Sequence, residues 1–400
     1  IFIHSLFRTG STYMFSVFRR SPAGYCCYQE PLHEAALYAQ KDPRRLLKET
    51  EDKMDLLRHP RLQRPYFQEL YEVADLCLDK LHKFAIYDAY FALSAEEAGV
   101  PFWQSLIAAS PARPVIQECR TSSRIGTIKS ALGGVHLYLW RNPWDQWWSS
   151  QIDDYFQVMN LLFINAPEHP GIIDDVRRAI RFTPYRNKDL RQEMAHFRTR
   201  LLRPEDSYLL FYTLWCLGLL EAMNRADVLI NMDRLSSSSD YKQEVSETLH
   251  AHGMPGLDFS DCRLPQATYQ DQEVHFFRTQ EAKAHSLFVQ EEEAQESVDR
   301  IKKLRTSALE GHPPESVDCV SAEALLRDAG RGRELYLQSL TTRCREQALV
   351  RKALKEKREM QKVLEKTESE RKSLQKKLQK LARRAARAED ELKRRDRELR

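Results

Sequence analysis

The sequence predicts an α/β fold, in which a parallel sheet is flanked by helices, followed by a C-terminal coiled coil. Short apolar, β-prone runs alternate with segments of helical periodicity through the first part of the chain, which is typical of a parallel sheet. With 400 residues and 42% hydrophobic side chains, the chain can bury a substantial core. Residues 349–400 instead repeat apolar side chains every seven residues, without proline or glycine.

Five segments have the apolar and β-branched or aromatic character of buried strands. In chain order they are Ile1–His4, Tyr25–Gln29, Pro114–Cys119, Val135–Trp140 and Asp227–Met232. The segments between them with helical spacing include Tyr66–Phe84, Ser122–Leu132, Trp144–Leu162 and Tyr208–Arg225. Because open parallel sheets bind ligands at the carboxyl ends of their strands, the residues that follow each strand are candidates for function.

Proline and serine clusters divide the rest of the chain. Leu235–Asp240 contains four consecutive serines and predicts a loop, and Pro255–Pro265 predicts a second irregular stretch. The two prolines of His312–Glu315 mark a break, so we expect the α/β domain to span residues 1–315. A helical connector over 316–348 then leads to a coiled coil over 349–400.

The formal net charge of +4 is unevenly distributed along the chain. Residues 349–400 carry 20 Lys and Arg against 10 Asp and Glu, a net +10, which leaves 42 basic and 48 acidic side chains, a net −6, in the other 348 residues. Eleven of the fifteen a and d positions of the tail are apolar. We therefore expect the tail to self-associate or to pair with an acidic partner, with a solitary charged helix as the alternative. No nucleic-acid partner is expected.

Cysteine usage and hydropathy indicate the setting of the protein. The eight cysteines include no C-x-x-C spacing, so neither a metal site nor a disulfide framework is indicated, and a reducing, cytoplasmic compartment is the expectation. The longest apolar run, Tyr208–Leu220, is too short to cross a bilayer and predicts a buried helix. We expect the native start of the chain to lie upstream of Ile1, where an anchor or a signal would not be visible.

The first candidate site lies where the first predicted strand meets the first helix. Arg8–Thr12 places a glycine and two hydroxyl residues at this junction, where the free N–H groups and the dipole of a helix N-terminus favour an anion. The P-loop of a nucleotide kinase reads G-x-x-x-x-G-K-S/T, but here Ser11 replaces the lysine. The loop therefore suits a terminal phosphate or phosphosulfate better than a magnesium-bound triphosphate. An ordinary capped strand–turn–helix has the same pattern.

The second candidate site follows the fourth predicted strand. Arg141 comes directly after that strand, and Asn142-Pro143 turn the chain into a helix. Ser149 lies eight residues after Arg141, about two helical turns into this helix. An arginine at a strand end and a serine on the next helix can together bind a second phosphate.

Together the two motifs resemble the signatures of the PAPS-dependent sulfotransferases, PAPS being 3′-phosphoadenosine 5′-phosphosulfate. The first signature of that family, K/R-S/T-G-S/T-S/T, is similar to Arg8–Thr12. The second, R-D/N-P with a serine eight residues after the arginine, is similar to Arg141–Ser149. The resemblance covers about residues 1–260 and implies a P-loop-like fold that transfers a sulfuryl group from PAPS without a metal.

The resemblance implies a role for each matching residue. The residues that would hold the 5′-phosphosulfate are Arg8, Thr9, Gly10, Ser11 and Thr12. Arg141 and Ser149 would hold the 3′-phosphate, and Tyr13 stands where many members place a tryptophan that stacks on adenine. Arg8 would also stabilise the charge that develops on the leaving phosphate oxygen.

The segment Tyr28–Glu34 supplies the candidate general base. It resembles the E-P-L-x-H segment of the carbohydrate sulfotransferase branch, which implies Glu30 as the base, with His33 as the second choice. The structural alternative is a proline-initiated helix in which Glu30 and Glu34 are solvated charges at the N-terminus.

Two departures from the family pattern bear on the acceptor. Cytosolic members carry a catalytic histidine in a K-T-H strand, whereas Val115–Arg120 has none and offers Glu118 and Arg120 as reserve candidates. The C-terminal R-K-G-x-x-G motif of those members is also missing. Both departures favour a hydroxyl acceptor on a glycan over a phenol or a steroid.

Two other functions stay open on the sequence. A nucleotide-binding, kinase-like P-loop protein is disfavoured by the missing lysine. A non-catalytic scaffold that merely supports the coiled coil is disfavoured by the presence of all four key residues, Arg8, Glu30, Arg141 and Ser149.

Overall fold

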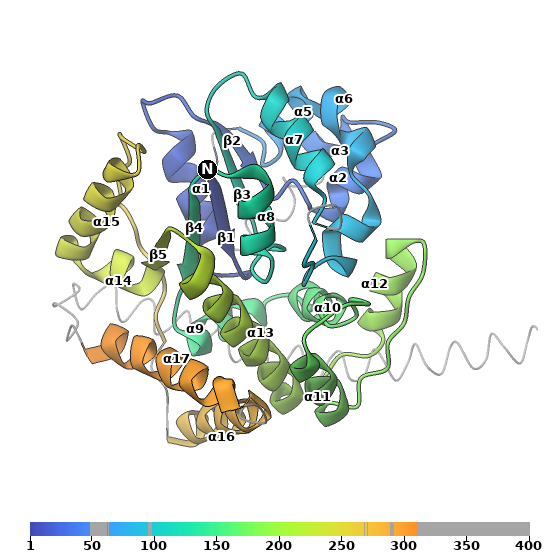
Figure 1. The fold of residues 1–400 in the computed structure, drawn as a ribbon, viewed down its shortest axis with the longest axis vertical. Helices are drawn as coiled ribbons and strands as arrows, with labels where there is room; N and C mark the ends of the chain where they lie inside the picture. The colour runs from blue at the N-terminus through green and yellow to red at the C-terminus, as the bar shows by residue number, and fades with distance from the viewer. Residues whose placement is uncertain are drawn as a thin grey trace, which may run out of the picture. The chain divides into compact units, whose positions relative to one another are not determined.

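A computed structural model describes residues 1–48, 62, 64–94, 98–267, 269, 271–288 and 292–310 of the chain. Its centre is a five-stranded, all-parallel sheet with the strand order β2-β3-β1-β4-β5 (Figure 1). The strands are β1 (Phe2–Ser5), β2 (Cys26–Gln29), β3 (Pro114–Glu118), β4 (His136–Trp140) and β5 (Val228–Asn231). All five predicted strands are confirmed, as is the α/β class.

The order of the strands creates one particular position at the edge of the sheet. β1 lies in the middle, where Phe2 stands opposite Ile116 of β3 and His136 of β4. The chain leaves β1 towards β2 but leaves β4 towards β5, in opposite directions across the sheet. The carboxyl ends of β1 and β4 therefore form a topological switch point, which is where open α/β sheets bind ligands.

Helices cover both faces of the sheet (Figure 1). One face packs against α1 (Ser11–Arg19), α14 (Met232–Ser237) and α15 (Ser239–Ala251). The other face packs against α7 (Val100–Ala109), α8 (Ile125–Leu132) and α13 (Pro204–Arg225). Alternate residues of each strand thus enter two separate cores, as expected for a buried parallel sheet. The predicted burial of Tyr208–Leu220 is confirmed, since this run forms the middle of α13.

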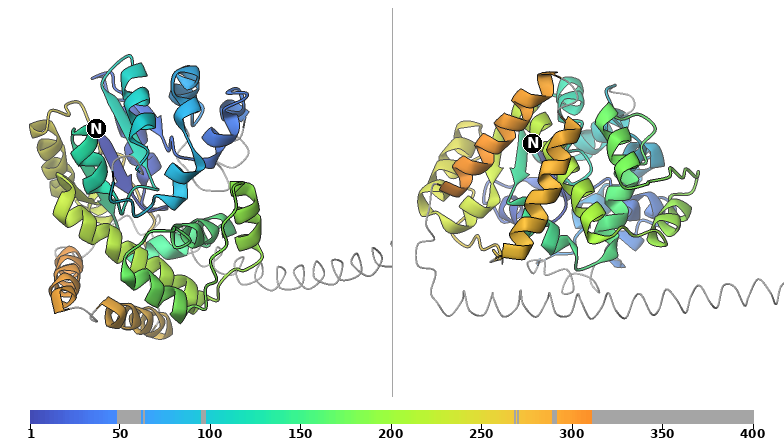
Figure 2. Two further views of the ribbon diagram at one scale, coloured as in Figure 1. Left: turned by 45° about the vertical axis from the view of Figure 1, so that its right-hand side comes forward. Right: turned by 90° about the horizontal axis from the view of Figure 1, so that it is seen from below.

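Some of the remaining helices pack against α13, and others lie beside β2 and α7 (Figure 1). They are α2 (Glu34–Ala39), α3 (Arg45–Lys48), α5 (Gln68–Glu72), α6 (Ala74–Cys77), the short helices Leu78–Lys80 and Phe84–Asp88, α9 (Pro143–Ser150), α10 (Asp154–Phe163), α11 (Gly171–Ala179), α12 (Leu190–Arg198), α16 (Asp271–Phe288) and α17 (Glu292–Glu310). The two views of Figure 2 show α16 and α17, in orange, beside α13, which both contact.

Local capping explains where the sequence prediction was wrong. The segment Trp144–Leu162 is two helices, because the Asp153 carboxylate accepts a hydrogen bond from the Tyr155 N–H and begins α10 anew. Tyr66–Phe84 is a series of short helical turns. Leu235–Asp240 is not a loop, because the Ser238 hydroxyl caps α15 by accepting from the Tyr241 N–H. Pro255–Pro265 is irregular, as predicted.

The predicted break at His312–Glu315, the connector over 316–348 and the coiled coil over 349–400 all lie outside the described residues. Within the described part, no helix combines the length and the apolar character needed to cross a membrane. The six cysteines of that part are free, buried thiols.

Candidate functional site

The loop between β1 and α1 has an unusual backbone. Arg8 has a φ of +67° and Gly10 a φ of +102°, both in the left-handed region. A Cβ at Gly10 would approach Met232 Cε to 3.2 Å and Leu264 Cδ2 to 3.3 Å, so the position favours glycine. The Thr9 hydroxyl donates a hydrogen bond to the Leu6 carbonyl, which closes the loop. The first turn of α1 then begins at Ser11.

The two sequence motifs meet at the switch point. Arg8 Nε donates a hydrogen bond of 3.0 Å to Ser149 Oγ on α9, across 141 residues of sequence. Gln146, one helical turn before Ser149, donates through Nε2 to the Phe7 carbonyl and to the Thr9 hydroxyl, each at 2.8 Å. Helix α9 is therefore bound directly to the loop after β1. Sequence reasoning missed Gln146, although its i, i+3 spacing to Ser149 places both on one helix face.

Arg141, at the carboxyl end of β4, has other partners than Ser149. Its Nε lies 3.3 Å from Asp233 Oδ1 of α14, and its Nη2 donates a 2.8 Å hydrogen bond to the Pro265 carbonyl. The residue is 3% exposed. Arg141 and Ser149, which the sequence led us to assign to one phosphate, thus belong to two separate sets of contacts.

The hydroxyl residues that follow Gly10 are mostly enclosed. Ser11 and Thr12 are buried, and Ser11 Oγ lies 3.6 Å from Cys119 Sγ. The Tyr13 hydroxyl donates a 2.8 Å hydrogen bond to Asp261, and the Arg20 guanidinium lies 5.7 Å from the ring centroid of Tyr13. The Tyr13 side chain is therefore hydrogen-bonded to the irregular stretch Pro255–Pro265.

Glu30, directly after β2, is held in a second strained conformation. Its φ is +40°, and Arg8 and Glu30 are two of the three non-glycine residues with positive φ in the described part of the chain. Glu30 Oε2 accepts a 2.7 Å hydrogen bond from Arg120 Nη1, and Oε1 accepts one of 2.8 Å from the Tyr66 hydroxyl. Glu30 is 7% and Glu34 6% exposed, so the alternative in which they are solvated helix charges is wrong.

The charge state of these carboxylates follows from their partners. Burial raises the pKa of Glu30, but the positive charges of Arg120 and His33 outweigh it and the net shift is downward. Burial also raises the pKa of Glu34, but His33 and Arg120 outweigh it and lower that pKa to about 2. Both side chains are therefore anions at neutral pH.

His33 caps α2 beside these carboxylates. Its Nδ1 accepts a 3.0 Å hydrogen bond from the Ala35 N–H and lies 3.6 Å from Glu34 Oε2. The ring stacks on Tyr155, with centroids 6.1 Å apart. With 24% of its side chain exposed, His33 is more accessible than Glu34.

Arg120 connects the carboxylates to the loop after β1. This fully buried guanidinium also donates to Glu34 Oε2 at 3.2 Å and to the Tyr155 hydroxyl at 2.8 Å. It lies 5.1 Å from the ring centroid of Phe7, the residue before Arg8. The sequence marked Arg120 only as a reserve candidate, because its contacts come from elements far apart in the chain.

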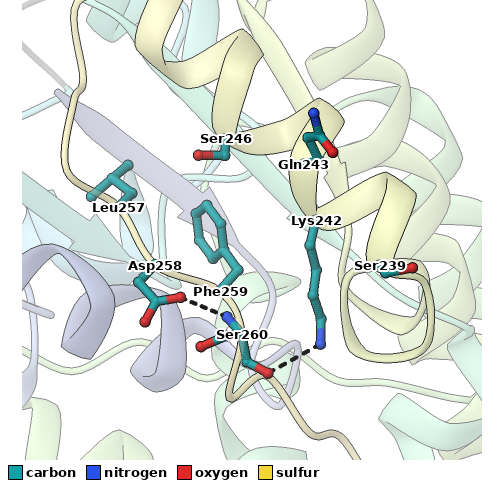
Figure 3. A pocket seen from close by; sticks show the side chains of 8 residues that line it. All are labelled: Ser239, Lys242, Gln243, Ser246, Leu257, Asp258, Phe259 and Ser260. Atoms are coloured by element: carbon teal, nitrogen blue, oxygen red, sulfur yellow. Dashed lines mark hydrogen bonds between the residues drawn. The ribbon is translucent and has the colours of Figure 1, made fainter.

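Two further features of the described residues bear on ligand binding. The described residues contain no group of three His, Cys, Asp or Glu side chains that could hold a metal ion. An open pocket of about 420 Å³ lies between α15 and the stretch Leu257–Ser260 (Figure 3). There Lys242 Nζ donates to the Ser260 carbonyl and the Ser260 N–H to Asp258. None of the predicted site residues lines this pocket.

No protein-family model matches the chain, and no significant match was found among curated proteins or solved structures. The sulfotransferase resemblance therefore depends on the two motifs and on their place in the fold. The motifs follow β1 and β4, the two strands on either side of the switch point, and are joined by the Arg8–Ser149 hydrogen bond.

Proposed function

We propose that the chain is a PAPS-dependent sulfotransferase with a P-loop-like fold that acts on a hydroxyl group, with a carbohydrate as the acceptor. The observation that carries the proposal is the hydrogen bond between Arg8 and Ser149 at the switch point of the sheet. It brings together a cation, a hydroxyl and the N-terminus of α1. These are the groups that an anionic phosphosulfate requires.

The residues around α1 fit the 5′ side of PAPS, which would supply the sulfuryl group. The backbone N–H groups of Ser11 and Thr12, the first two residues of α1, would donate to the phosphosulfate, whereas the Tyr13 N–H already donates to the Gly10 carbonyl at 3.0 Å. Arg8 and Ser149 are both half-buried, so they are accessible to a ligand and only partly screened by water. Because Ser149 contacts Arg8 and not Arg141, we assign it here to the 5′-phosphosulfate and not to the 3′-phosphate that the resemblance implies. Arg8 would stabilise the charge that develops on the leaving phosphate oxygen.

Glu30 would accept the proton of the attacking hydroxyl. It is anionic at neutral pH, as a proton acceptor must be, and its carboxylate is held by hydrogen bonds from Arg120 and Tyr66. The new bond forms between the acceptor oxygen and sulfur while the bond from sulfur to the phosphate oxygen breaks. His33 and Tyr155, both half-buried and stacked, lie beside Glu30 and would border the acceptor.

The 3′ side requires Arg141 to change partners. At present Asp233 and the Pro265 carbonyl occupy its guanidinium. Arg141→Ala should weaken 3′,5′-ADP binding by roughly 2–4 kcal/mol and leave 5′-AMP binding nearly unchanged, because only the former carries a 3′-phosphate. Calorimetric titration of both nucleotides measures this difference, and equal losses would remove Arg141 from the 3′-phosphate site.

Asp233 provides the matched variant for that experiment. Asp233 accepts a 2.5 Å hydrogen bond from the Asn142 N–H. Asp233→Asn removes the negative charge that competes for Arg141, but it keeps an oxygen that can accept this bond. We expect it to tighten 3′,5′-ADP binding by about threefold or more, because Arg141 no longer has to leave an ion pair.

Titration calorimetry with wild-type protein tests the proposed function itself. We expect 3′,5′-ADP to bind with a Kd on the order of micromolar, without magnesium. Preference for ATP with Mg²⁺ would instead favour a kinase-like protein. Binding of neither nucleotide would favour a non-catalytic scaffold.

A further inference from the structure

A cluster of three glutamates surrounds the buried Arg120 guanidinium, and the proposed chemistry uses only one of them, Glu30. Arg120 lies 2.7 Å from Glu30, 3.2 Å from Glu34 and 3.7 Å from Glu118. The three carboxyl groups come from the end of β2, from α2 and from the end of β3. One guanidinium cannot neutralise three buried carboxylates, so the arrangement favours a proton on one of them.

The contacts of Glu118 single it out as that group. The residue is 1% exposed. Its Oε1 accepts a 3.3 Å bond from the Leu32 N–H, and its Oε2 is buried without a hydrogen-bond partner in the described part of the chain. An ionised carboxylate with so few donors costs much more free energy to bury than a neutral acid does.

The charged groups that face Glu118 do not reverse this conclusion. Arg124, at the start of α8, donates its Nη groups to the carbonyls of Ala85, Ala89 and Arg120. His4, which stands opposite Glu118 in β1, is buried, and burial lowers its pKa well below the usual value, so it carries no charge. Burial, with the anion of Glu30, outweighs Arg120 and Arg124 and raises the pKa of Glu118 to about 8.

We propose that Arg120 is a positioning residue for Glu30, and that Glu118 supports it as a neutral acid that leaves the guanidinium to Glu30 and Glu34. The inference depends on the proposed function only for the role of Glu30 as the base. When Glu118 ionises, it competes for Arg120 Nη1, which now donates to Glu30. Glu30, at a φ of +40°, then loses the contact that fixes its carboxylate. Sulfuryl transfer should therefore fall as the pH rises through the pKa of Glu118.

The pH profile of Glu118→Gln tests this inference, because glutamine mimics the neutral acid and cannot ionise. For wild-type protein, a single ionisation near pH 8 leaves kcat/KM at about pH 9 at about one-tenth of its value at about pH 6.5. For Glu118→Gln the same ratio should stay near one. A ratio in Glu118→Gln that falls as far as in wild type would overturn the inference.

Glu193→Gln is the matched control for this profile. Glu193, on α12, is also buried, and burial raises its pKa; its ion-pair partner is Lys83, not Arg120. This variant should keep the fall in kcat/KM of wild type at alkaline pH.

If Glu118→Gln does not fold, Arg120→Lys replaces it as the test. Lysine keeps the positive charge but cannot bind Glu30 and Glu34 at the same time. It should lower kcat about tenfold or more with little change in KM for PAPS, and an unchanged kcat would overturn the inference.

Thermal unfolding without any nucleotide separates this inference from the proposed function. In the unfolded chain Glu118 loses its proton near its ordinary pKa of 4.5, and in the folded chain near 8. Between these values the unfolded state binds fewer protons, so wild-type stability falls as the pH rises. The Tm of wild type should therefore fall more steeply than that of Glu118→Gln. If Tm falls equally steeply with pH in both proteins, Glu118 is not a neutral acid, whatever reaction the chain catalyses. Different slopes without sulfuryl transfer support it and overturn the proposed function instead.

Discussion

Glu30→Gln should lower kcat by ~10²-fold or more while the Kd of 3′,5′-ADP stays within about threefold of wild type. Glutamine has nearly the same size, and its single amide oxygen can still accept the hydrogen bond from Arg120, but it cannot take up the hydroxyl proton. Single-turnover kinetics with PAPS measure the loss, and calorimetry measures the affinity. Because Arg120 and His33 lower the pKa of Glu30, wild-type activity should persist until the pH falls below the ordinary range of a glutamate.

Glu69→Gln is the control for the loss of a buried ion pair. Glu69 pairs with Arg19 at 2.6 Å, at the C-terminal end of α1, so this variant removes a comparable contact away from the carboxyl edge of the sheet. It should keep its turnover. If Glu30→Gln stays active while His33→Ala is inactive, the base is His33 and the assignment of Glu30 is wrong.

Arg8→Ala should lower kcat by ~10²–10³-fold, the usual effect of removing a donor that stabilises developing charge. The guanidinium, which donates to Ser149 at 3.0 Å, is lost with its positive charge. Alanine keeps a Cβ, so the strain of the φ of +67° is unchanged and the loss reports the side chain alone. Pre-steady-state turnover of PAPS measures the effect.

Arg181→Ala is the control for Arg8→Ala. Arg181 is the third non-glycine residue of the described chain with a positive φ, at +54°, and it follows α11, away from the switch point. It should retain wild-type turnover. Equal turnover of Arg8→Ala and wild type would remove Arg8 from the stabilisation of the leaving group.

The sheet could be predicted from the sequence because strands buried on both faces are continuous apolar runs. The runs Ile1–His4 and Val135–Trp140 contain no glycine or proline. Helical segments separate the predicted strands, so consecutive strands are not joined by the short turns of antiparallel hairpins. Helix ends were harder, because a single side chain decides them. Asp153 caps α10 and so separates it from α9, and Ser238, in the serine cluster, caps α15. Propensity alone does not show which polar residue will cap.

The sequence identified the residues of the candidate site, but not which of their side chains contact one another. The motifs located Arg8, Ser149 and Arg141 at the carboxyl edge. They could not show that Ser149 contacts Arg8, or that Asp233 contacts Arg141, because such contacts depend on strand order and on where α9 and α14 pack. The importance of Arg120 was missed for the same reason, because its partners lie directly after β2, in α2 and in α10.

Transfer of labelled sulfur tests the central claim most directly. Wild-type protein, Arg8→Ala and Glu30→Gln would each be incubated with sulfur-labelled PAPS and a panel of glycans, with lipids and peptides alongside. We expect wild type to release 3′,5′-ADP in step with the label that appears on a glycan hydroxyl, and both variants to transfer ~10²-fold less. Label on none of the acceptors, with no 3′,5′-ADP released, would contradict the account.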